Sequence, residues 1–238
     1  MRLAWRAAVA IAASAIVIPV FVTPATASHS WNGYHWSTGS YPINLDPTNS
    51  LSDGFRDTGI STDVNADWNR SSRFANTQRF GANDATTRSD CPYPAGRSYR
   101  MCDYNWGATG WAGLAQIHIN GNHITDGRVR VNNYYGTSNS YRRHVLCQEV
   151  GHVLGLDHQA SGNNSCMDDS SAGWDELHPN AHDYEMLERI YDHRHTSLAA
   201  TAGTGERTLH REVCSNRTVT RLADGTLLVE LFLPPPAQ

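Results

Sequence analysis

The chain has 238 residues, of which 39% are hydrophobic and 18% charged, which is ordinary for a globular protein with a sizeable core. The formal net charge of −4 argues against a nucleic-acid partner. The sequence also contains no basic amphipathic helix of the kind that binds a membrane surface. We expect one domain with appendages, and a monomer.

Residues 1–27 have the features of a secretory signal. Arg2 and Arg6 form a charged start, Ala7 to Val22 form an apolar run, and Ala25-Thr26-Ala27 is a small-residue cleavage site. Two prolines in this segment favour cleavage over the alternative, a single membrane anchor. We therefore predict a secreted, extracellular chain that is not attached to a membrane after cleavage.

Regular elements are predicted at several places before residue 135. The alternation of Tyr41, Ile43 and Leu45 predicts a strand, and the pattern over residues 51–68 predicts a helix, although two glycines interrupt it. Residues 74–110 are loop-rich, with little periodicity. Two strands then follow, Gly113 to Ile119 and Arg128 to Asn132, around a turn at residues 120–127.

Export makes the five cysteines candidates for disulfide bonds. Cys91 and Cys102 bracket a turn-rich stretch, so a local disulfide between them is the first expectation. Five cysteines also permit other connectivities. Cys214 is left over and is free, intermolecular or a partner in a different pairing.

The stretch from His144 to His158 carries most of the functional information. Its apolar residues recur at helical spacing, with Ser138 or Ser140 as the candidate N-cap and Gly155 as the left-handed stop. We therefore predict a buried helix that ends at Gly155.

Three side chains of this stretch are candidate metal ligands. Gln148 and His152 are four residues apart, so they leave one face of the helix a turn apart. Beyond the glycine the chain can fold back and bring His158 to the same point, with Glu149 beside the three. Two ligands one turn apart, a third after a glycine turn and an adjacent carboxylate are typical of zinc hydrolases.

The stretch resembles the signature of the metzincin metalloproteases, and most closely that of matrixins, including secreted bacterial matrixin-like proteins. That signature is His-Glu-x-x-His-x-x-Gly-x-x-His followed by a Met-turn. The matching residues are Gln148, Glu149, His152, Gly155 and His158, with Met167 in Ser-Cys-Met-Asp as the Met-turn residue. The resemblance covers about residues 34–195. It implies an α+β fold: a metzincin-like catalytic domain with a twisted mixed sheet, an active-site helix, a Met-turn and a closing carboxy-terminal helix.

One position departs from the signature, because Gln148 stands where the first histidine is expected. An amide oxygen is neutral, as imidazole is, so the charge of the site would be unchanged. Zinc prefers nitrogen and sulfur, so binding would be weaker. The alternative is that Gln148 lies near the site without ligating the metal.

The resemblance also implies two contacts. If the Met-turn packs beneath the metal site as in metzincins, Cys147 and Cys166 can form a disulfide between the helix and the turn. In matrixins an edge strand at this place binds extended substrate, and the strand from Leu114 to Ile119 is the candidate. No cysteine-switch propeptide is expected, because fewer than about ten residues lie between the cleavage site and the first domain-like segment.

Other metal sites are weaker predictions. Asp168, Asp169 and Asp175 offer oxygen ligands for Ca²⁺, but no spaced calcium loop is visible. His118 and His123 are an alternative pair for a structural metal, although the matrixin pattern for such a site is incomplete.

The carboxy-terminal part is predicted to hold a helix, a linker and a hairpin. A helix from about residue 180 to 193 would close the domain that spans residues 28–195, and residues 196–206 read as a flexible linker. In the extension at 207–238, Asp224-Gly225 between two apolar runs predicts a hairpin. One hairpin is rarely stable alone, so it packs on the domain, adds to a partner edge or is poorly ordered.

The expected function is that of a secreted zinc endopeptidase acting on peptides or proteins, with Gln148, His152 and His158 as ligands and Glu149 as general base. The alternative is a protease-like module that binds peptide or protein without turnover, which the substitution at Gln148 favours and the retained Glu149 disfavours.

Overall fold

The computed structural model describes residues 28–159, 162–168, 174–192 and 217–235. Its strands are β1 (His35–Trp36), β2 (Thr48–Ser50), β3 (Arg79–Phe80), β4 (Tyr99–Tyr104), β5 (Gly113–Asn120), β6 (His123–Asn132), β7 (Arg217–Arg221) and β8 (Leu227–Leu233). Its helices are α1 (Asp53–Arg56), α2 (Ile60–Trp68), α3 (Ala85–Asp90), α4 (Asn139–Val153) and α5 (Ala181–Ile190). The predicted signal segment, the linker at 196–206 and Cys214 lie outside the described residues.

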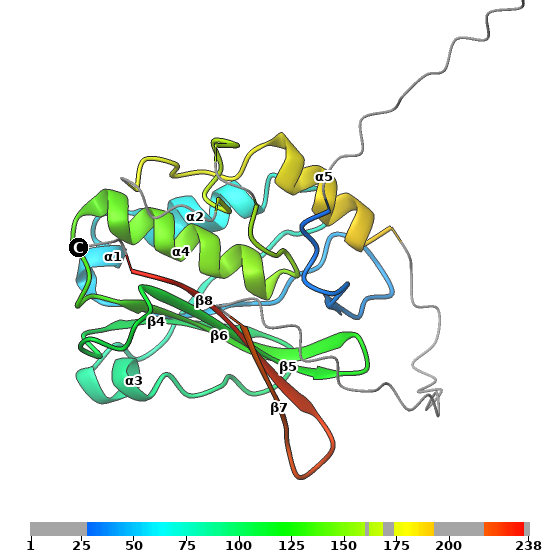
Figure 1. Cartoon of the computed structure of the whole chain (residues 1–238), viewed down its shortest axis with the longest axis horizontal. Coiled ribbons are helices and arrows are strands. Elements are labelled where there is room, and N and C mark those ends of the chain that lie inside the picture. The colour runs from blue at the N-terminus through cyan, green and yellow to red at the C-terminus, as the bar shows by residue number, and fades with distance from the viewer. Residues whose placement is uncertain (1–27, 160–161, 169–173, 193–216, 236–238) are drawn as a thin grey trace, which may run out of the picture.

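The strands form one mixed sheet in the order β3-β2-β4-β6-β5-β8-β7, with β1 pairing beside β6. β4 runs parallel to both β2 and β6, whereas β5 is antiparallel to β6 and to β8. Figure 1 shows α2, α4 and α5 on one side of this sheet and α3 on the other. The expected α+β class agrees with this mixed sheet and its few helices.

Helix α4 is the central element of the core, as the apolar period predicted. Ser138 caps it, because its hydroxyl accepts a hydrogen bond from the Tyr141 N–H at 3.2 Å. The helix packs on β5 and β6 below and on α2 at its side. It is therefore buried around most of its circumference, and even its polar residues His144, Gln148 and His152 are 0% exposed.

The interpretation of residues 74–110 as loop was wrong for β4 and α3. β4 is an interior strand with α3 packed against it, and its consecutive buried residues from Met101 to Asp103 lack the alternation of a half-buried strand. Helix α3 has no buried residues and hence no apolar period, and only its N-cap Asp84, which accepts from the Thr87 N–H at 3.0 Å, marks its start.

Two amino-terminal predictions also need correction. The segment of Tyr41, Ile43 and Leu45 is not a strand: only an isolated bridge joins Ile43 to Phe74, and the strand starts later, at Thr48. The helix predicted over residues 51–68 is divided into α1 and α2, because Gly59 adopts a left-handed φ of 75° between them.

The carboxy-terminal hairpin packs on the main domain, the first of the three predicted outcomes. β8 pairs with β5 from Leu227 opposite Ile119 to Leu233 opposite Gly113. The prediction that the strand from Leu114 to Ile119 is a free substrate-binding edge is therefore wrong for this structure. An apolar strand of the same chain already fills its hydrogen-bonding side.

The length and apolar character of the helices bear on whether the chain could span a bilayer. Among the residues that the structure describes, no helix is long and apolar enough to cross a membrane.

Candidate metal centre

A glycine turn at the end of α4 brings His158 back to the helix. Gly155 has a φ of 106°, and a Cβ there would also collide with the Tyr34 carbonyl oxygen. Its N–H donates to the His152 carbonyl at 2.9 Å, and the Leu156 N–H donates to the Gly151 carbonyl at 3.1 Å. These bonds reverse the chain direction within a few residues.

The reversal places two imidazole nitrogens face to face. Nε2 of His152 lies 3.1 Å from Nε2 of His158. The His152 Nδ1–H donates to the Leu156 carbonyl at 2.9 Å, which leaves Nε2 as the ring atom with a lone pair. Two nitrogens bound to one tetrahedral zinc at about 2.0 to 2.1 Å would stand roughly 3.3 Å apart. The pair therefore fits two positions of a zinc ion.

Gln148 is held one helical turn before His152. Its Nε2 donates to the Asp168 carbonyl at 2.9 Å, and this bond fixes the plane of the amide. Its Oε1 is buried and has no hydrogen-bond partner among the described residues. A buried amide oxygen without a partner costs free energy, and it is the atom through which glutamine would ligate a metal.

Glu149 is 0% exposed, and neither of its carboxylate oxygens has a hydrogen-bond partner of normal geometry in the described part of the chain. Burial raises its pKa well above the ordinary value, and the Ala115 N–H only partly offsets this effect. Room for the carboxylate comes from Gly113 on β5, where a Cβ would lie 2.7 Å from the Glu149 Cδ.

The histidines are also poised as neutral groups. Burial is the main reason why the pKa of His152 lies well below its ordinary value, and the neighbouring His158 lowers it further. Burial lowers the pKa of His158 to about 4, although the adjacent Asp157 opposes the shift. Neutral imidazole is the form that binds a metal ion.

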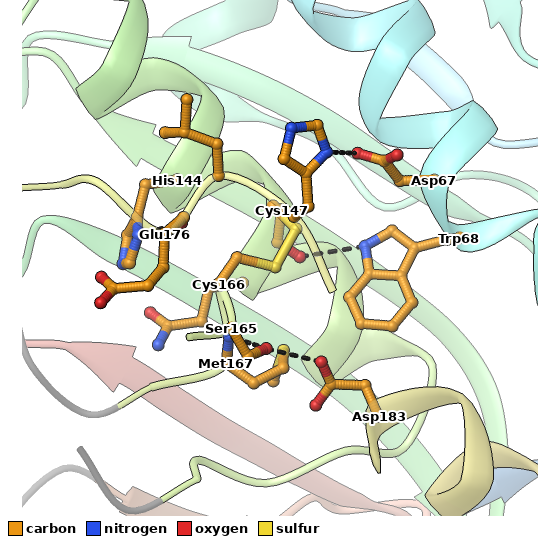
Figure 2. Close-up of a disulfide and its surroundings, with 12 residues drawn as sticks. Asp67, Trp68, His144, Cys147, Ser165, Cys166, Met167, Glu176 and Asp183 are labelled. Carbon is orange, nitrogen blue, oxygen red and sulfur yellow. Dashed lines mark hydrogen bonds and ion pairs between the residues drawn. A yellow bond between two sulfur atoms is a disulfide. The ribbon is translucent and has the colours of Figure 1, made fainter. Parts of the chain in front are cut away.

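Met167, the predicted Met-turn residue, packs against α4. It is 0% exposed and packs against Gly151, whose missing side chain admits both Met167 and the Trp68 ring. Figure 2 shows the Cys147–Cys166 disulfide between α4 and the segment that carries Met167, with the Trp68 Nε1–H donating to the Cys147 carbonyl at 3.1 Å. The other predicted pair, Cys91 and Cys102, is also bonded.

Two residues beside the site were not foreseen from sequence. Asp157 forms an ion pair at 2.5 Å with Arg217, the first residue of β7, and the Arg217 side chain is only 8% exposed. Arg217 is close enough to lower the pKa of both His152 and His158. An arginine some sixty positions downstream gives no sequence signal, because only strand pairing brings it here.

The remaining metal predictions gain no geometric support. Asp168 is buried with Oδ2 accepting from two backbone N–H groups, Asp175 is exposed, and Asp169 lies outside the described residues. His118 bonds Asp126 at 2.7 Å, whereas the His123 ring meets the His35 ring edge to face. Within the described residues, no three His, Cys, Asp or Glu side chains form a metal-binding group.

No protein-family model matches the chain, and no curated protein matches it.

Proposed function

We propose that the chain is a secreted, monomeric, zinc-dependent endopeptidase with a metzincin-like catalytic domain. The observation that carries this proposal is the 3.1 Å separation of the His152 and His158 Nε2 atoms, with the buried carboxylate of Glu149 on the same helix as His152. The unpartnered Oε1 of Gln148 makes it the candidate third ligand. Two disulfides are consistent with an extracellular location.

In this proposal the residues that hold the metal and the residue that acts as the base have separate roles. Zinc, when bound, supplies Lewis acidity that polarises the scissile carbonyl and acidifies water. His152 and His158 hold it as neutral imidazoles, with the His152 tautomer set by the Leu156 carbonyl. Glu149 takes a proton from the attacking water on a carboxylate oxygen and returns it to the leaving amine.

The raised pKa of Glu149 is compatible with this role. Without a nearby cation, burial favours the protonated form of this carboxyl group. A cation held by His152 and His158 would lower this pKa again, because an opposite charge within a few ångströms stabilises the carboxylate. Metal binding would therefore also favour the ionised form of Glu149, which is the form that acts as a base.

Elemental analysis of the mature protein tests the metal centre. We expect about one zinc per chain, and His158→Ala should abolish binding. His118→Ala is the matched control, since this histidine lies on β5 and bonds Asp126 instead. A folded protein that takes up no zinc would contradict the proposal.

Hydrolysis of an unfolded protein tests the chemistry. Cleavage should be lost with a chelator, and Glu149→Gln should abolish it while zinc stays bound. Gln148→His should tighten zinc roughly tenfold or more, because imidazole nitrogen replaces an amide oxygen. Weaker zinc binding in a folded Gln148→His variant would show that this residue is not a ligand.

A second candidate is a module that binds peptide or protein without turnover. It is favoured by Gln148, because an amide oxygen at the first ligand position would bind zinc more weakly than imidazole would. A chain that binds zinc but shows no chelator-sensitive hydrolysis in any variant would select this candidate.

A further inference from the structure

The position of Glu149 defines where a peptide substrate would have to lie. Its carboxylate faces Gly113, the first residue of β5. An extended peptide brought to this carboxylate would therefore run beside β5 and bond to its backbone, as peptides do at exposed sheet edges. One side of β5 pairs with β6, so only the other side is available for such pairing.

That other side is occupied by β8. The antiparallel ladder covers β5 from Ile119 to Gly113, and the Ala112 N–H extends it by donating to the Leu233 carbonyl at 2.8 Å. Leu233 pairs with Gly113, the residue against which the Glu149 carboxylate rests. The strand thus ends at the point where a substrate would meet the base.

Alternate side chains of β8 are buried with α4 in the core. Val229, Leu231 and Leu233 are at most 1% exposed and belong to the same hydrophobic cluster as the apolar residues of α4. Leu228 is on the opposite face of the strand and remains partly exposed. The docked strand is therefore an extended segment with aliphatic residues at every second position.

The partner strand β7 contacts the loop that carries His158. Arg217 lies opposite Leu231, and its ion pair with Asp157 holds the residue that precedes His158. Figure 1 shows the hairpin of β7 and β8 lying along β5. With the hairpin in place, Gln148, Glu149 and His152 have no exposed surface.

We propose that the β7–β8 hairpin is a built-in inhibitor of this site. It fills the position of an extended peptide along β5 and keeps the site closed until a competing strand displaces it. The chemistry of β8 identifies the competitor as an extended segment with aliphatic side chains at alternate positions. The inhibitory role of the hairpin rests on the proposed protease function, whereas displacement of β8 by a competing strand does not depend on it.

Opening variants test the proposal in the full-length chain. Leu231→Asp with Arg217→Ala places a carboxylate on the buried face of β8 and removes the ion pair with Asp157. If the wild-type hairpin is docked about 90 to 99% of the time, opening should raise hydrolysis roughly 10- to 100-fold. Leu228→Asp with Arg217 intact is the matched control on the outer face, and it should behave as the wild type.

A closing variant covers the case in which the opening variant does not fold. Gln116 and Glu230 are directly opposed and their side chains are hydrogen-bonded, so cysteines at both positions can form a cross-strand disulfide. The oxidised Gln116→Cys, Glu230→Cys protein should lose residual hydrolysis and recover it on mild reduction. Wild type treated with the same reductant is the control. Undiminished hydrolysis in the locked protein would overturn the proposal.

Binding in trans separates the two proposals. A fluorescent peptide with the sequence of residues 226–234 should bind the opened variant and not the locked one, and the same peptide with Leu231→Asp should bind neither. Peptide binding without hydrolysis would contradict the protease function and support the proposal that β8 can be displaced. The opposite outcome is a folded opened variant that binds no peptide and hydrolyses substrate as fast as the wild type. It would contradict the inhibitor proposal and support the protease function.

Discussion

At the scale of single residues, the site contains buried polar atoms that lack hydrogen-bond partners among the described residues. Within the described residues, Gln148 Oε1 and both Glu149 oxygens are buried without hydrogen bonds, and two imidazole nitrogens approach to 3.1 Å. The unpartnered Gln148 oxygen raises the free energy of the metal-free protein, because buried polar groups normally find partners, whereas the two imidazole nitrogens lie within hydrogen-bonding distance of each other. Binding of a cation by Gln148 Oε1 would relieve the cost at that atom.

Gly113→Ala tests whether the position of the Glu149 carboxylate matters for catalysis. The added Cβ would lie 2.7 Å from the carboxylate carbon, so the carboxylate has to move. We expect hydrolysis to fall by about 100-fold while zinc content is unchanged, since misplacement by about 1 Å costs that much. Gly127→Ala on β6, where the nearest atom would be at 3.3 Å, is the control. Unchanged hydrolysis by the Gly113 variant would argue against Glu149 as the base.

The lowered pKa values of the histidines predict a pH dependence of stability. A histidine with a folded-state pKa below its unfolded value of 6.5 takes up its proton more readily when unfolded, so the free energy of unfolding falls as pH drops below 6.5. For His158, with a pKa of about 4, the loss at pH 5 relative to pH 8 is about 2 kcal/mol. His144 and His152 shift in the same direction.

Glu149 acts in the opposite sense, so its contribution must be removed in the measurement. Its raised pKa means that the unfolded chain ionises first, and stability is lost as pH rises above about 4.5. Urea unfolding of the Glu149→Gln variant with chelator, from pH 8 to pH 5, therefore isolates the histidines. A flat profile would show that the imidazoles are solvated in the metal-free protein.

At the scale of elements, α4 and the turn at Met167 form one unit. Gly155 reverses the chain, Gly151 admits the Met167 side chain, and the Cys147–Cys166 disulfide joins the two segments across 19 residues. The candidate ligands lie on both sides of the Gly155 turn, so their separation depends on how firmly this unit is held.

Removing the helix-to-turn disulfide should therefore affect both stability and metal binding. We expect Cys147→Ala with Cys166→Ala to lower the free energy of unfolding by about 3 kcal/mol, the usual value for a loop of this length. Zinc affinity, measured by chelator competition, should fall as well. Cys91→Ala with Cys102→Ala is the matched control, which should lose stability and keep its zinc affinity. Equal zinc affinity in both variants would contradict the role of the disulfide at the site.

At the scale of the whole molecule, a buried carboxylate joins distant segments around the site. Asp183 on α5 is 0% exposed and lies 3.1 Å from His29 Nε2 in the amino-terminal arm. It also accepts hydrogen bonds from Gln159, beyond the ligand loop, and from Ser165, before Met167. One side chain thus connects the arm, the loop, the turn and the closing helix.

Asp183→Asn should be strongly destabilising. An amide would present a donor where the carboxylate now meets only donors, and loss of one partner of a buried pair costs about 3 to 5 kcal/mol. Thermal and urea unfolding measure the effect, with Asp57→Asn at an exposed position as the control. A change below about 1 kcal/mol would mean that the network is solvated.

Some parts of this architecture could be predicted because their signals are local. The apolar period, Ser138 and Gly155 were enough to predict α4 and its end, and Asp224-Gly225 predicted the turn of the last hairpin. β4 could not be found in the same way, since a strand buried on both faces has no alternating pattern. The break at Gly59 shows the reverse error, in which a helical pattern continued through a left-handed residue.

The sequence by itself determined the set of candidate ligands, the candidate base and the glycine turn that lets them meet, because residue type and spacing along one helix are local properties. Only the tertiary structure decided that Arg217 lies beside His158 and that β8 fills the edge of β5. Both contacts join residues more than fifty positions apart. Such contacts form because pairing a strand hides its backbone polar groups and its apolar side chains, and that gain depends on the whole sheet.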